Sequence, residues 1–327
     1  MDDKSLLDVL AAMGTGLALV SSWVIWRIRS RVIKTIFVVI AAMAILVGVG
    51  AFGISHRPLP NDEQRVLFQS IDYARIVRLE PVPVVIHIVR IDLQDERLQF
   101  FVTPRTPTGE YEQTARTTSR ALKEFRLQVA INGDFFDPSY DYGFFSYYPH
   151  VGDGINLYGA SVANGQRVTN GYADDFQTLS IDANHQVTIA DEPLPDAQVA
   201  ISGYLTPVRD GQIGITINDT RSIVTDRFPR TAIGVDRLNR TLYLFVIDGR
   251  QPNYSEGVTL PELAQIMIEV GVYQGLNLDG GGSSTLVIEG DNGEPMVLNS
   301  PIHGRLPGLE RPVGNHFGLY AARIGNP

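Results

Sequence analysis

The sequence predicts an α+β protein: a sheet-rich, mixed α/β globular domain with few helices, preceded by an N-terminal transmembrane helical hairpin. Three observations lead to this prediction. Short apolar runs recur at a spacing of roughly 10 residues between turn signals, as in sheet-rich folds. Only two segments have the apolar periodicity of helices that cover a core. The N-terminal region contains two long apolar stretches.

The second of these stretches, residues 36–54, is the stronger candidate for a membrane span. It has 19 residues without a charge, close to the ~20 residues that cross a bilayer. Residues 6–26 form the other apolar stretch, and its C-terminal end carries Trp23 and Trp26, which suit a membrane interface. We therefore expect two spans and a lipid bilayer as a partner of the N-terminal helices.

A cluster of positive charge between the two apolar stretches predicts the topology. Arg27, Arg29, Arg31 and Lys34 lie in this short connection, and such loops stay in the cytoplasm. The large domain is then expected at the cell membrane on the extracytoplasmic side. The alternative is a cleaved signal peptide ending near Ala51, but the apolar region is too long and no small-x-small cleavage site is well placed.

The charge distribution divides the chain and excludes one class of partner. We expect residues 1–57 to be the membrane anchor, residues 58–80 a linker and residues 81–327 the globular domain. The net charge is −9, and residues 1–57 carry +3 (six Lys and Arg against three Asp), which leaves −9 − 3 = −12 for the rest. An acidic domain of this kind repels nucleic acid, so an anionic substrate needs a few local arginines. The chain has 0 Cys, which excludes thiol chemistry, disulfides and thiolate-bound zinc.

The regular elements follow from the pattern of apolar residues. Helices are expected at residues 114–125 and 259–270; in the second, Thr259 and Glu262 form a capping box and Gly271 suits the C-terminal cap. Glu262 is for this reason interpreted as a capping residue and not as a catalyst. Strands are expected at residues 84–91, 98–102, 127–131, 177–181, 199–201, 213–217, 231–235, 241–247, 275–278, 284–288 and 317–321.

A glycine-rich segment provides the clearest indication of a functional site. Asp279 is followed by Gly280, Gly281 and Gly282, and then by the hydroxyls of Ser283 and Ser284. Three glycines leave no side chains beside the carboxylate and permit backbone angles closed to other residues. The segment does not match phosphate-loop, dinucleotide-binding or serine-nucleophile motifs. A plain glycine-rich hairpin is the alternative.

Three predicted strands end in polar residues next to glycine. The ends are Asn132-Gly133-Asp134, Asp248-Gly249-Arg250 and Asp279-Gly280. Each one alone is typical of a turn. Together at one edge of a sheet they would form a pocket lined by carboxylates, in which burial raises the pKa of one carboxyl group.

The same motifs, in this order, resemble the phosphodiester glycosidase family. The resemblance covers roughly residues 80–323, with residues 230–284 the most specific part. One position departs from the family: Asp134 stands where a second Gly is common, which bears on the substrate more than on the fold. The motifs that carry the resemblance are Ala130-Ile131-Asn132-Gly133-Asp134-Phe135-Phe136, Arg230-Thr231-Ala232-Ile233-Gly234, Val246-Ile247-Asp248-Gly249-Arg250, Asn277-Leu278-Asp279-Gly280-Gly281-Gly282-Ser283 and Arg311-Pro312-Val313.

The resemblance implies a hydrolase of sugar-1-phosphodiester linkages, with a phosphorylated glycan or glycolipid as substrate. Asp279 is the candidate carboxylate at C1 of the sugar and Asp248 its acid/base partner. Arg230 and Arg311 are the candidate phosphate ligands, since a guanidinium pairs with two oxygens at once. The remaining candidates, expected to bind sugar hydroxyls or phosphate oxygens, are Asn132, Asp134, Thr231, Asn277, Gly280, Gly281, Gly282, Ser283 and Ser284.

No cofactor is expected, although a divalent cation is left open. The six histidines have no metal-binding spacing. His303, near Arg305, either reaches the site or is a loop residue, and the loop residue is the default interpretation. Aromatic residues crowd residues 135–148, where they would either stack on sugar rings or pack in the core. Two other functions remain at this stage: a non-catalytic surface carbohydrate-binding protein, and a metal-dependent phosphodiesterase that cleaves the P–O bond.

Overall fold

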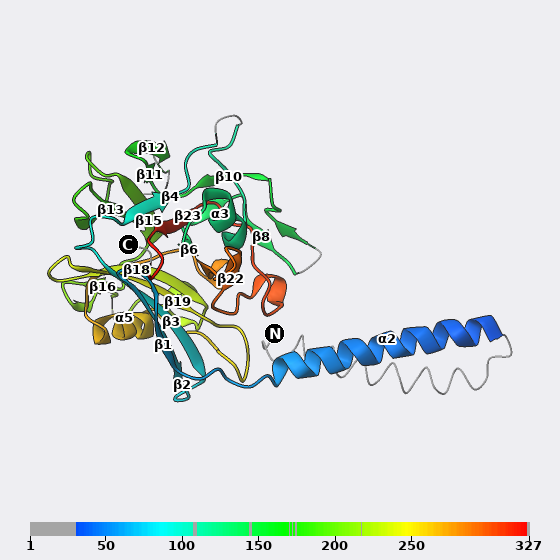
Figure 1. Ribbon diagram of the computed structural model, residues 1–327. Helices are drawn as coiled ribbons and strands as arrows, with labels where there is room; N and C mark the ends of the chain where they lie inside the picture. Colours follow the sequence, from blue (N-terminus) through cyan, green and yellow to red (C-terminus); the bar gives the residue numbers. More distant parts are fainter. Residues whose placement is uncertain are drawn as a thin grey trace. The chain divides into compact units, whose positions relative to one another are not determined.

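The computed structural model describes residues 31–325, except 107–109, 144–145, 170, 172, 174 and 217. The chain divides into two compact units: residues 1–59 with 251–254, and residues 60–250 with 255–327. The described helices are few, and most of the second unit is antiparallel sheet (Figure 1). The α-helices of the described part are α2 (Arg31–Ser55), α3 (Thr118–Phe125), α4 (Ser222–Thr225) and α5 (Leu260–Glu269). The sheet-rich α+β prediction is therefore confirmed for the globular part.

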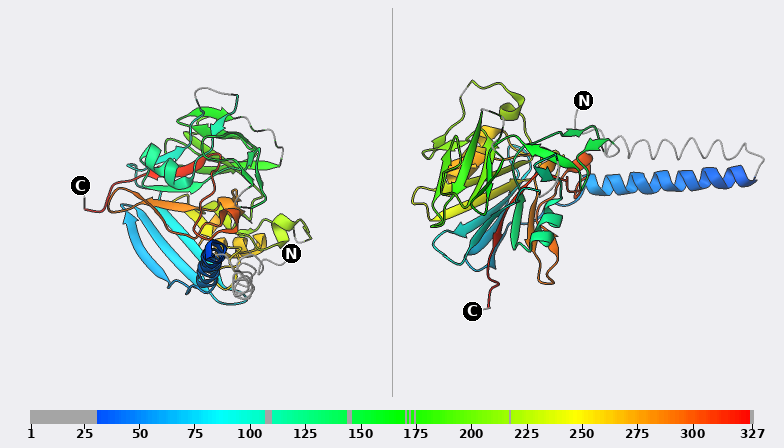
Figure 2. Two further views of the ribbon diagram at one scale, coloured as in Figure 1. Left: turned by 90° about the vertical axis from the view of Figure 1, so that its right-hand side faces the viewer. Right: turned by 90° about the horizontal axis from the view of Figure 1, so that it is seen from above.

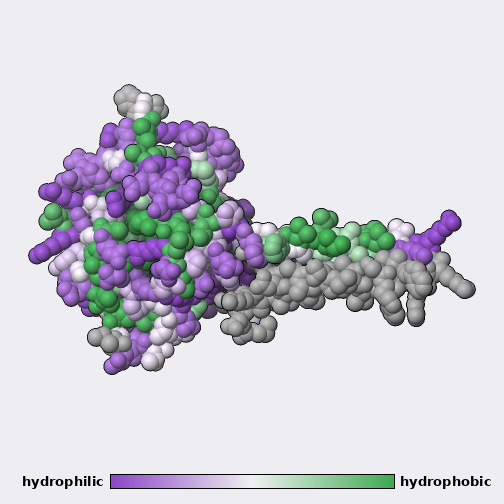
Figure 3. All heavy atoms as spheres, turned by 90° about the horizontal axis from the view of Figure 1, so that it is seen from below, coloured by the Kyte–Doolittle hydropathy of each residue, from purple (hydrophilic) through white to green (hydrophobic). Residues whose placement is uncertain are grey.

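Helix α2 is long and apolar enough to cross a bilayer by length and composition, over Arg31–Ile54. Its large apolar side chains are exposed along most of its length (Figure 3), for example Leu46 with 71% of its surface accessible. This helix contains the expected span at 36–54. The other expected span, residues 6–26, lies outside the described residues, so one apolar helix is established here and a hairpin of two is not.

The largest sheet of the second unit has eight strands in the order β1-β2-β3-β19-β18-β20-β16-β17, and all its neighbours are antiparallel. The pairing of β18 with both β19 and β20 sets the ends of these strands beside one another. The strands are β1 (Glu63–Phe68), β2 (Ile71–Arg78), β3 (Val84–Asp92), β16 (Val208–Arg209), β17 (Gln212–Ile213), β18 (Arg230–Asp236), β19 (Thr241–Ile247) and β20 (Val272–Asn277).

Two five-stranded sheets complete most of the fold, in the orders β22-β21-β6-β23-β4 and β12-β11-β15-β13-β14. The first contains β4 (Gln99–Val102), β6 (Val129–Asn132), β21 (Leu286–Glu289), β22 (Pro295–Val297) and β23 (His316–Tyr320). The second contains β11 (Ser161–Ala163), β12 (Gln166–Thr169), β13 (Phe176–Ile181), β14 (Val187–Ala190) and β15 (Val199–Tyr204). The smaller sheets are formed by β5 (Gln113–Thr114), β7 (Phe136–Asp137) and β10 (Gly154–Leu157), and by β8 (Tyr140–Asp141) and β9 (Tyr147–Tyr148).

The sheets of the second unit lie in layers (Figure 2), and the alternation of apolar side chains along the strands decides which of them lie between the layers. One face of the eight-stranded sheet packs against α5, for example through Phe245 and Ile247. The other face contributes Leu244 and Val246 to a core shared with both five-stranded sheets. Each fully buried side chain of this kind contributes ~1.5–3 kcal/mol. Because β19 is buried on both faces, its C-terminal end emerges inside the molecule and places Asp248 there.

Helix α5 begins as the sequence predicts. The Thr259 hydroxyl accepts a hydrogen bond from the Glu262 main chain, and the Glu262 carboxylate accepts one from the Thr259 main chain. Such a capping residue contributes ~0.5–2 kcal/mol. Gly271 has φ of +102°, as expected just after the helix end. The interpretation of Glu262 as a capping residue is confirmed.

The predicted secondary structure differs from the observed fold in several parts. The segment 58–80, expected to be a linker, contains strands β1 and β2, and β2 pairs along its whole length with β3. Of the described residues 213–216 in the strand expected at 213–217, only Ile213 is in a strand, the two-residue β17. Helix α3 begins at Thr118, with Thr117 as its N-terminal cap, and not at 114.

Candidate active site

The glycine-rich segment is a tight loop that follows β20 and contains the short 3₁₀ helix η1 (Gly281–Ser283). The Asp279 N–H donates to the Gly133 carbonyl at 3.1 Å, and the Gly281 N–H donates to the Pro229 carbonyl at 2.9 Å. A Cβ atom on Gly280 would lie 2.8 Å from the Pro229 oxygen, and Gly281 has φ of +62°. The first two glycines are therefore required by close backbone approach and by a left-handed conformation.

The Asn132 side chain joins this loop to the ends of β6 and β18. Its amide nitrogen donates to the Asp279 carbonyl at 2.6 Å. Its oxygen accepts from the Thr231 hydroxyl at 2.7 Å and from the Thr285 N–H at 3.1 Å. Asn132 and Thr231 are both fully buried, so they position the loop and leave no polar atom for a substrate.

Asp248 lies beside the same loop but is enclosed. Its Oδ1 accepts hydrogen bonds from the Asn299 amide at 3.0 Å and the Ser300 N–H at 2.8 Å, and its Oδ2 lies 3.2 Å from His87 Nε2. Asn299 also donates to the Ser284 carbonyl at 3.0 Å, which ties Asp248 to the loop. The Asp248 side chain has 0% of its surface exposed. The expected acid/base role is therefore corrected, because this carboxylate has no access to a substrate; it positions Asn299.

His87 is a partner of Asp248 that the sequence did not indicate. It is buried, and its Nδ1 lies 2.8 Å from the Tyr73 hydroxyl. With the carboxylate as acceptor, Nε2 carries the proton and Nδ1 accepts from Tyr73. Only the register of β3 with β19, in which His87 is opposite Val246, brings this histidine to Asp248.

Asp134, expected to bind substrate, is also enclosed. Its carboxylate accepts from the Ser202 N–H at 2.5 Å and from the Asn315 amide at 2.7 Å. Burial raises the pKa of Asp134 well above its ordinary value, against the lowering effect of these hydrogen bonds. A Cβ on Gly133 would lie 2.3 Å from Asn315 Oδ1, so the glycine before Asp134 makes room for this pair. Asp134 therefore has a structural role through Ser202 and Asn315 and does not line the site.

Asn277 is equally buried, and its amide donates to the Tyr204 carbonyl at 3.1 Å. Its Oδ1 has no hydrogen-bond partner among the described residues, and the same holds for the hydroxyls of Ser284 and Thr285. Buried polar atoms without partners carry a free-energy cost and cluster at functional sites. Their position around the glycine loop makes this region the candidate binding site.

Of the three predicted aspartates, Asp279 is the one that is half-buried as a residue, whereas Asp134 and Asp248 are fully buried. Burial raises its pKa, and the nearby positive charge of Arg311 opposes the shift, with a smaller contribution from Arg250. A carboxyl group with a raised pKa beside two guanidinium groups can exchange a proton with a bound anion. Asp279 is therefore the best-placed acid or base of the predicted residues.

Three arginines lie near this region. Arg230 has a structural role, whereas Arg311 and Arg250 lie beside the glycine loop. Arg230 is buried; its Nε donates to the Val258 carbonyl at 3.1 Å, and its Nη2 donates to the carbonyls of Ile223 (2.7 Å) and Asp226 (3.2 Å). Burial, followed by the charge of Arg250, lowers the pKa of Arg230 to about 10. These contacts correct its expected role: Arg230 fixes the α4 segment to β18.

Arg311 and Arg250 border the glycine loop instead. A Cβ on Gly282 would lie 3.6 Å from Arg311 Cδ, and a Cβ on Gly281 would lie 3.2 Å from Arg250 Nη1. Arg311 is partly exposed, and its guanidinium lies 5.4 Å from the centre of the Phe136 ring. Arg250 belongs to one of the motifs noted in the sequence, but the sequence alone did not assign it to the site.

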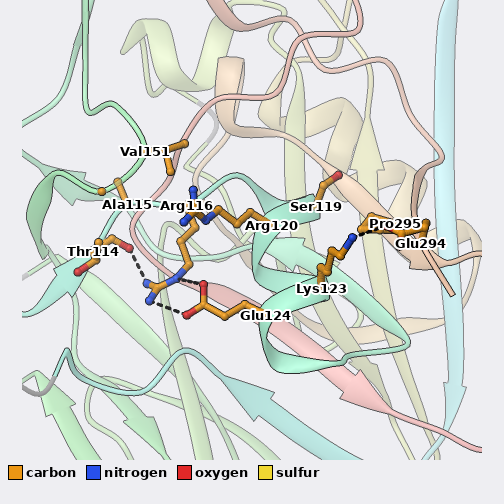
Figure 4. A pocket seen from close by; sticks show the side chains of 11 residues that line it. Thr114, Ala115, Arg116, Ser119, Arg120, Lys123, Glu124, Val151, Glu294 and Pro295 are labelled. Atoms are coloured by element: carbon orange, nitrogen blue, oxygen red, sulfur yellow. Dashed lines mark hydrogen bonds and ion pairs between the residues drawn. The ribbon is translucent and has the colours of Figure 1, made fainter.

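A separate surface pocket of about 730 Å³ lies beside α3 (Figure 4). It carries several cationic side chains, but Arg116 is paired with Glu124 and Lys123 with Glu294. None of the predicted site residues lines this pocket. Within the described residues, no group of three or more His, Asp and Glu is arranged to hold a metal ion.

Comparison with known proteins assigns the family. A family model described as phosphodiester glycosidase matches residues 125–320, which is more than half of the chain. The chain belongs to the phosphodiester glycosidase family. This confirms the resemblance seen in the sequence motifs, and the matched range contains Asn132, Asp248, Asp279 and Arg311.

Two relatives with similar sequences, one bovine and one human, have the same name. The bovine N-acetylglucosamine-1-phosphodiester alpha-N-acetylglucosaminidase is 28% identical over 210 residues, which are 57% of this chain and 36% of the bovine protein. The human protein of the same name is 34% identical over 104 residues, 28% of this chain and 19% of the human protein. These matches therefore span about a third or less of the relatives' length.

Solved structures of the same fold include the zebrafish enzyme of that name, in a catalytic domain auto-inhibited by its pro-peptide. It has a TM-score of 0.57 and 22% identity, and the match covers 81% of this chain and 85% of that one. A hypothetical protein from Synechocystis has a TM-score of 0.57 and 14% identity, with 80% and 64% covered. At these identities the likeness concerns the phosphodiester glycosidase fold alone.

Proposed function

We propose that the protein is a membrane-anchored hydrolase that cleaves sugar-1-phosphodiester linkages in an envelope glycan or glycolipid. Membership of the phosphodiester glycosidase family supports the reaction class. The observation that carries the proposal is the position of Asp279. This residue precedes three glycines, and the positive charges of Arg311 and Arg250 act on its carboxyl group.

The chemistry of the substrate explains this arrangement. A glycosyl phosphodiester has an anionic leaving group, and guanidinium groups neutralise phosphate oxygens through paired hydrogen bonds. Cleavage of the C1–O bond develops positive charge on the sugar, which carboxylates stabilise. In the proposed site Arg311 and Arg250 hold the phosphate, and Asp279 exchanges a proton with the oxygen that bridges it to the sugar.

The anchor is proposed from helix α2 and from the charges before it. An apolar helix over Arg31–Ile54 would fix the chain to the bilayer, and the positive residues 27–34 would keep its N-terminal end in the cytoplasm. The acidic domain is then outside, where envelope glycans are found. A reporter enzyme fused after Pro327 tests this topology, and activity of the fusion only in the cytoplasm would overturn it.

The reaction is tested with the full chain in detergent and a panel of sugar-1-phosphodiesters, including those of N-acetylglucosamine. We expect release of a free sugar and a phosphomonoester. In H₂¹⁸O the label is expected in the sugar, because the C1–O bond breaks. Label in the phosphate would instead identify a phosphodiesterase that cleaves the P–O bond, and binding without turnover would identify a carbohydrate-binding protein.

A further inference from the structure

We propose that Asp141, on the β8–β9 hairpin, is the second catalytic carboxylate of this site. Its side chain lies beside Gly282 of the glycine loop. The inference rests on the proposed glycosidase function and assigns the residue that stabilises the positive charge on the sugar. The sequence motifs point to Asp279 for this role and to Asp248 as its partner, and Asp141 lies outside these motifs.

The placement of Asp141 is the first argument. A Cβ on Gly282 would lie 3.8 Å from Asp141 Oδ2, 3.7 Å from His303 Cα and 3.6 Å from Arg311 Cδ. Asp141 and Arg311 therefore both lie within van der Waals contact of the position that a Cβ on Gly282 would take. The Asp141 side chain has 26% of its surface exposed, whereas that of Asp248 has 0%. A ligand at the glycine loop can reach Asp141 and cannot reach Asp248.

A buried histidine supports this carboxylate. His303 Nδ1 lies 3.6 Å from Asp141 Oδ2, and the His303 side chain is only 3% exposed. The ring of Tyr147 packs against the imidazole at 4.4 Å between centroids and 85° between planes. Neither ring nitrogen of His303 has a hydrogen-bond partner among the described residues, and the Nδ1–Oδ2 contact with Asp141 is an ion-pair distance. A histidine enclosed in this way, with one ring nitrogen towards Asp141, serves to position that carboxylate.

The two carboxyl groups have opposite electrostatic environments. His303, together with the Gly143 N–H at 3.1 Å and Arg311, lowers the pKa of Asp141 to about 2. Burial raises the pKa of Asp279, although Arg311 acts on it as well. Pairs of carboxyl groups whose pKa values are driven apart are typical of glycosidases, in which one is the acid and the other carries the charge.

The division of roles gives a balanced reaction. As the C1–O bond breaks, its electron pair leaves with the phosphate oxygen, which takes the proton of Asp279. The ionised Asp141 stabilises the cation at C1. A water oxygen then forms the new bond to C1 and gives one proton to the Asp279 carboxylate, which restores the acid. The products are the free sugar and a phosphomonoester.

The test compares Asp141→Asn with Asp137→Asn, a control at an exposed aspartate of the preceding strand β7. Both variants are made in the full chain and assayed on the sugar-1-phosphodiester that the wild type cleaves best. We expect Asp141→Asn to lower kcat by about 10²- to 10⁴-fold, with KM and the melting temperature near those of the wild type. We expect the control to be unchanged. Normal turnover in Asp141→Asn overturns the proposal.

A second variant, His303→Gln, keeps Asp141 intact and tests its environment. Loss of the imidazole removes the largest influence that lowers the pKa of Asp141, so the acidic limb of the kcat/KM profile should move to higher pH. A merely structural histidine would lower activity equally at every pH, and that result overturns the role of the pair. If the wild type cleaves no sugar phosphodiester, the proposed function and this inference both fail. If the wild type cleaves it and the variants behave as the wild type does, the proposed function stands and this inference alone fails.

Discussion

The side-chain amide of Asn132 donates a hydrogen bond to the main-chain carbonyl of Asp279 at 2.6 Å, although the two residues are 147 positions apart. The oxygen of the same amide accepts from Thr231 and from the main chain of Thr285. One buried side chain thus links the end of β6, the start of β18 and both ends of the glycine loop. The position of the Asp279 carboxyl group depends on this link.

Thr231→Val tests the link, because it keeps the shape of the side chain and removes the hydroxyl that donates to Asn132. The Asn132 oxygen keeps the hydrogen bond from the Thr285 main chain, so we expect the free energy of unfolding to fall by the ~0.5–1.5 kcal/mol that one hydrogen bond contributes. We also expect kcat/KM to fall as the loop loosens. Denaturant unfolding and steady-state kinetics measure the two effects. Thr188→Val, at an exposed position of β14, is the control and should change neither. An unaltered stability in Thr231→Val would remove Asn132 from its central role.

Neighbouring glycines should respond differently to alanine. In Gly280→Ala the new Cβ would lie 2.8 Å from the Pro229 main-chain oxygen, so we expect a loss of ~1–3 kcal/mol in stability. In Gly282→Ala the nearest atoms are 3.6–3.8 Å away, which is ordinary contact. The methyl group would fit the fold but fill the space between Arg311 and Asp141.

For Gly282→Ala we therefore expect a melting temperature near that of the wild type and a large fall in kcat/KM. For Gly280→Ala we expect the melting temperature to fall. Thermal unfolding and kinetics on the same preparations separate the two effects. Full activity in Gly282→Ala would mean that the substrate does not approach this part of the loop.

The parts of the fold that the sequence predicts correctly are those set by local signals. The strand at 241–247 was expected at the observed bounds of β19, because an unbroken apolar run between Thr241 and Asp248 leaves little choice. The cap of α5 depends on two residues three positions apart. Strand β1 was missed because proline and charged residues obscure the pattern before residue 67, and four of its six residues are charged or amide side chains or lie exposed. Strand β2 was missed because Asp72, Arg75 and Arg78 interrupt its apolar residues.

The sequence predicted which strand ends come together better than it predicted the environment of each side chain there. The sequence indicated that the strand ends at Asn132, Asp248 and Asp279 would converge, and the hydrogen bonds through Asn132 and Asn299 connect them. It could not indicate which carboxylates are enclosed. His87 reaches Asp248 from 161 positions away, and only strand register decides this. Nothing in the sequence distinguishes Asp141 from other loop aspartates, because its partner His303 lies far along the chain.

The two arginines first considered for phosphate binding should separate in kinetics. Arg230→Lys keeps the charge but cannot donate to the three carbonyls that Arg230 now satisfies, so stability should fall. Activity should fall equally on a sugar-1-phosphodiester and on an aryl glycoside of the same sugar.

Arg311→Gln should instead weaken the phosphodiester selectively. A hydrogen bond to a charged group contributes ~1.5–3 kcal/mol, so we expect about a 10- to 150-fold loss of kcat/KM on the phosphodiester beyond the loss on the aryl glycoside. The ratio of the two kcat/KM values is the measurement. If Arg230→Lys is the variant with the selective loss, the two assignments must be exchanged.

Asp279→Asn tests the proton donor through the pH dependence of activity and of stability. Because the proposed reaction needs the protonated acid, kcat/KM of the wild type should fall as pH rises through the raised pKa of Asp279. The variant should lose this basic limb and about 10²- to 10⁴-fold in kcat. Arg311 lowers the pKa of Asp279, so in Arg311→Gln the basic limb should move to higher pH.

The same pKa shift has a defined sign in stability. The folded state holds the Asp279 proton more tightly than the unfolded state, so the free energy of unfolding falls as pH rises from the ordinary value of 3.8 to the raised pKa. Asp134 contributes with the same sign, since its pKa is also raised. The difference between wild type and Asp279→Asn, measured by denaturant unfolding across this range, isolates Asp279. The variant should gain stability relative to the wild type as pH increases; a constant difference would mean that Asp279 is not held protonated, and the acid would have to be another group.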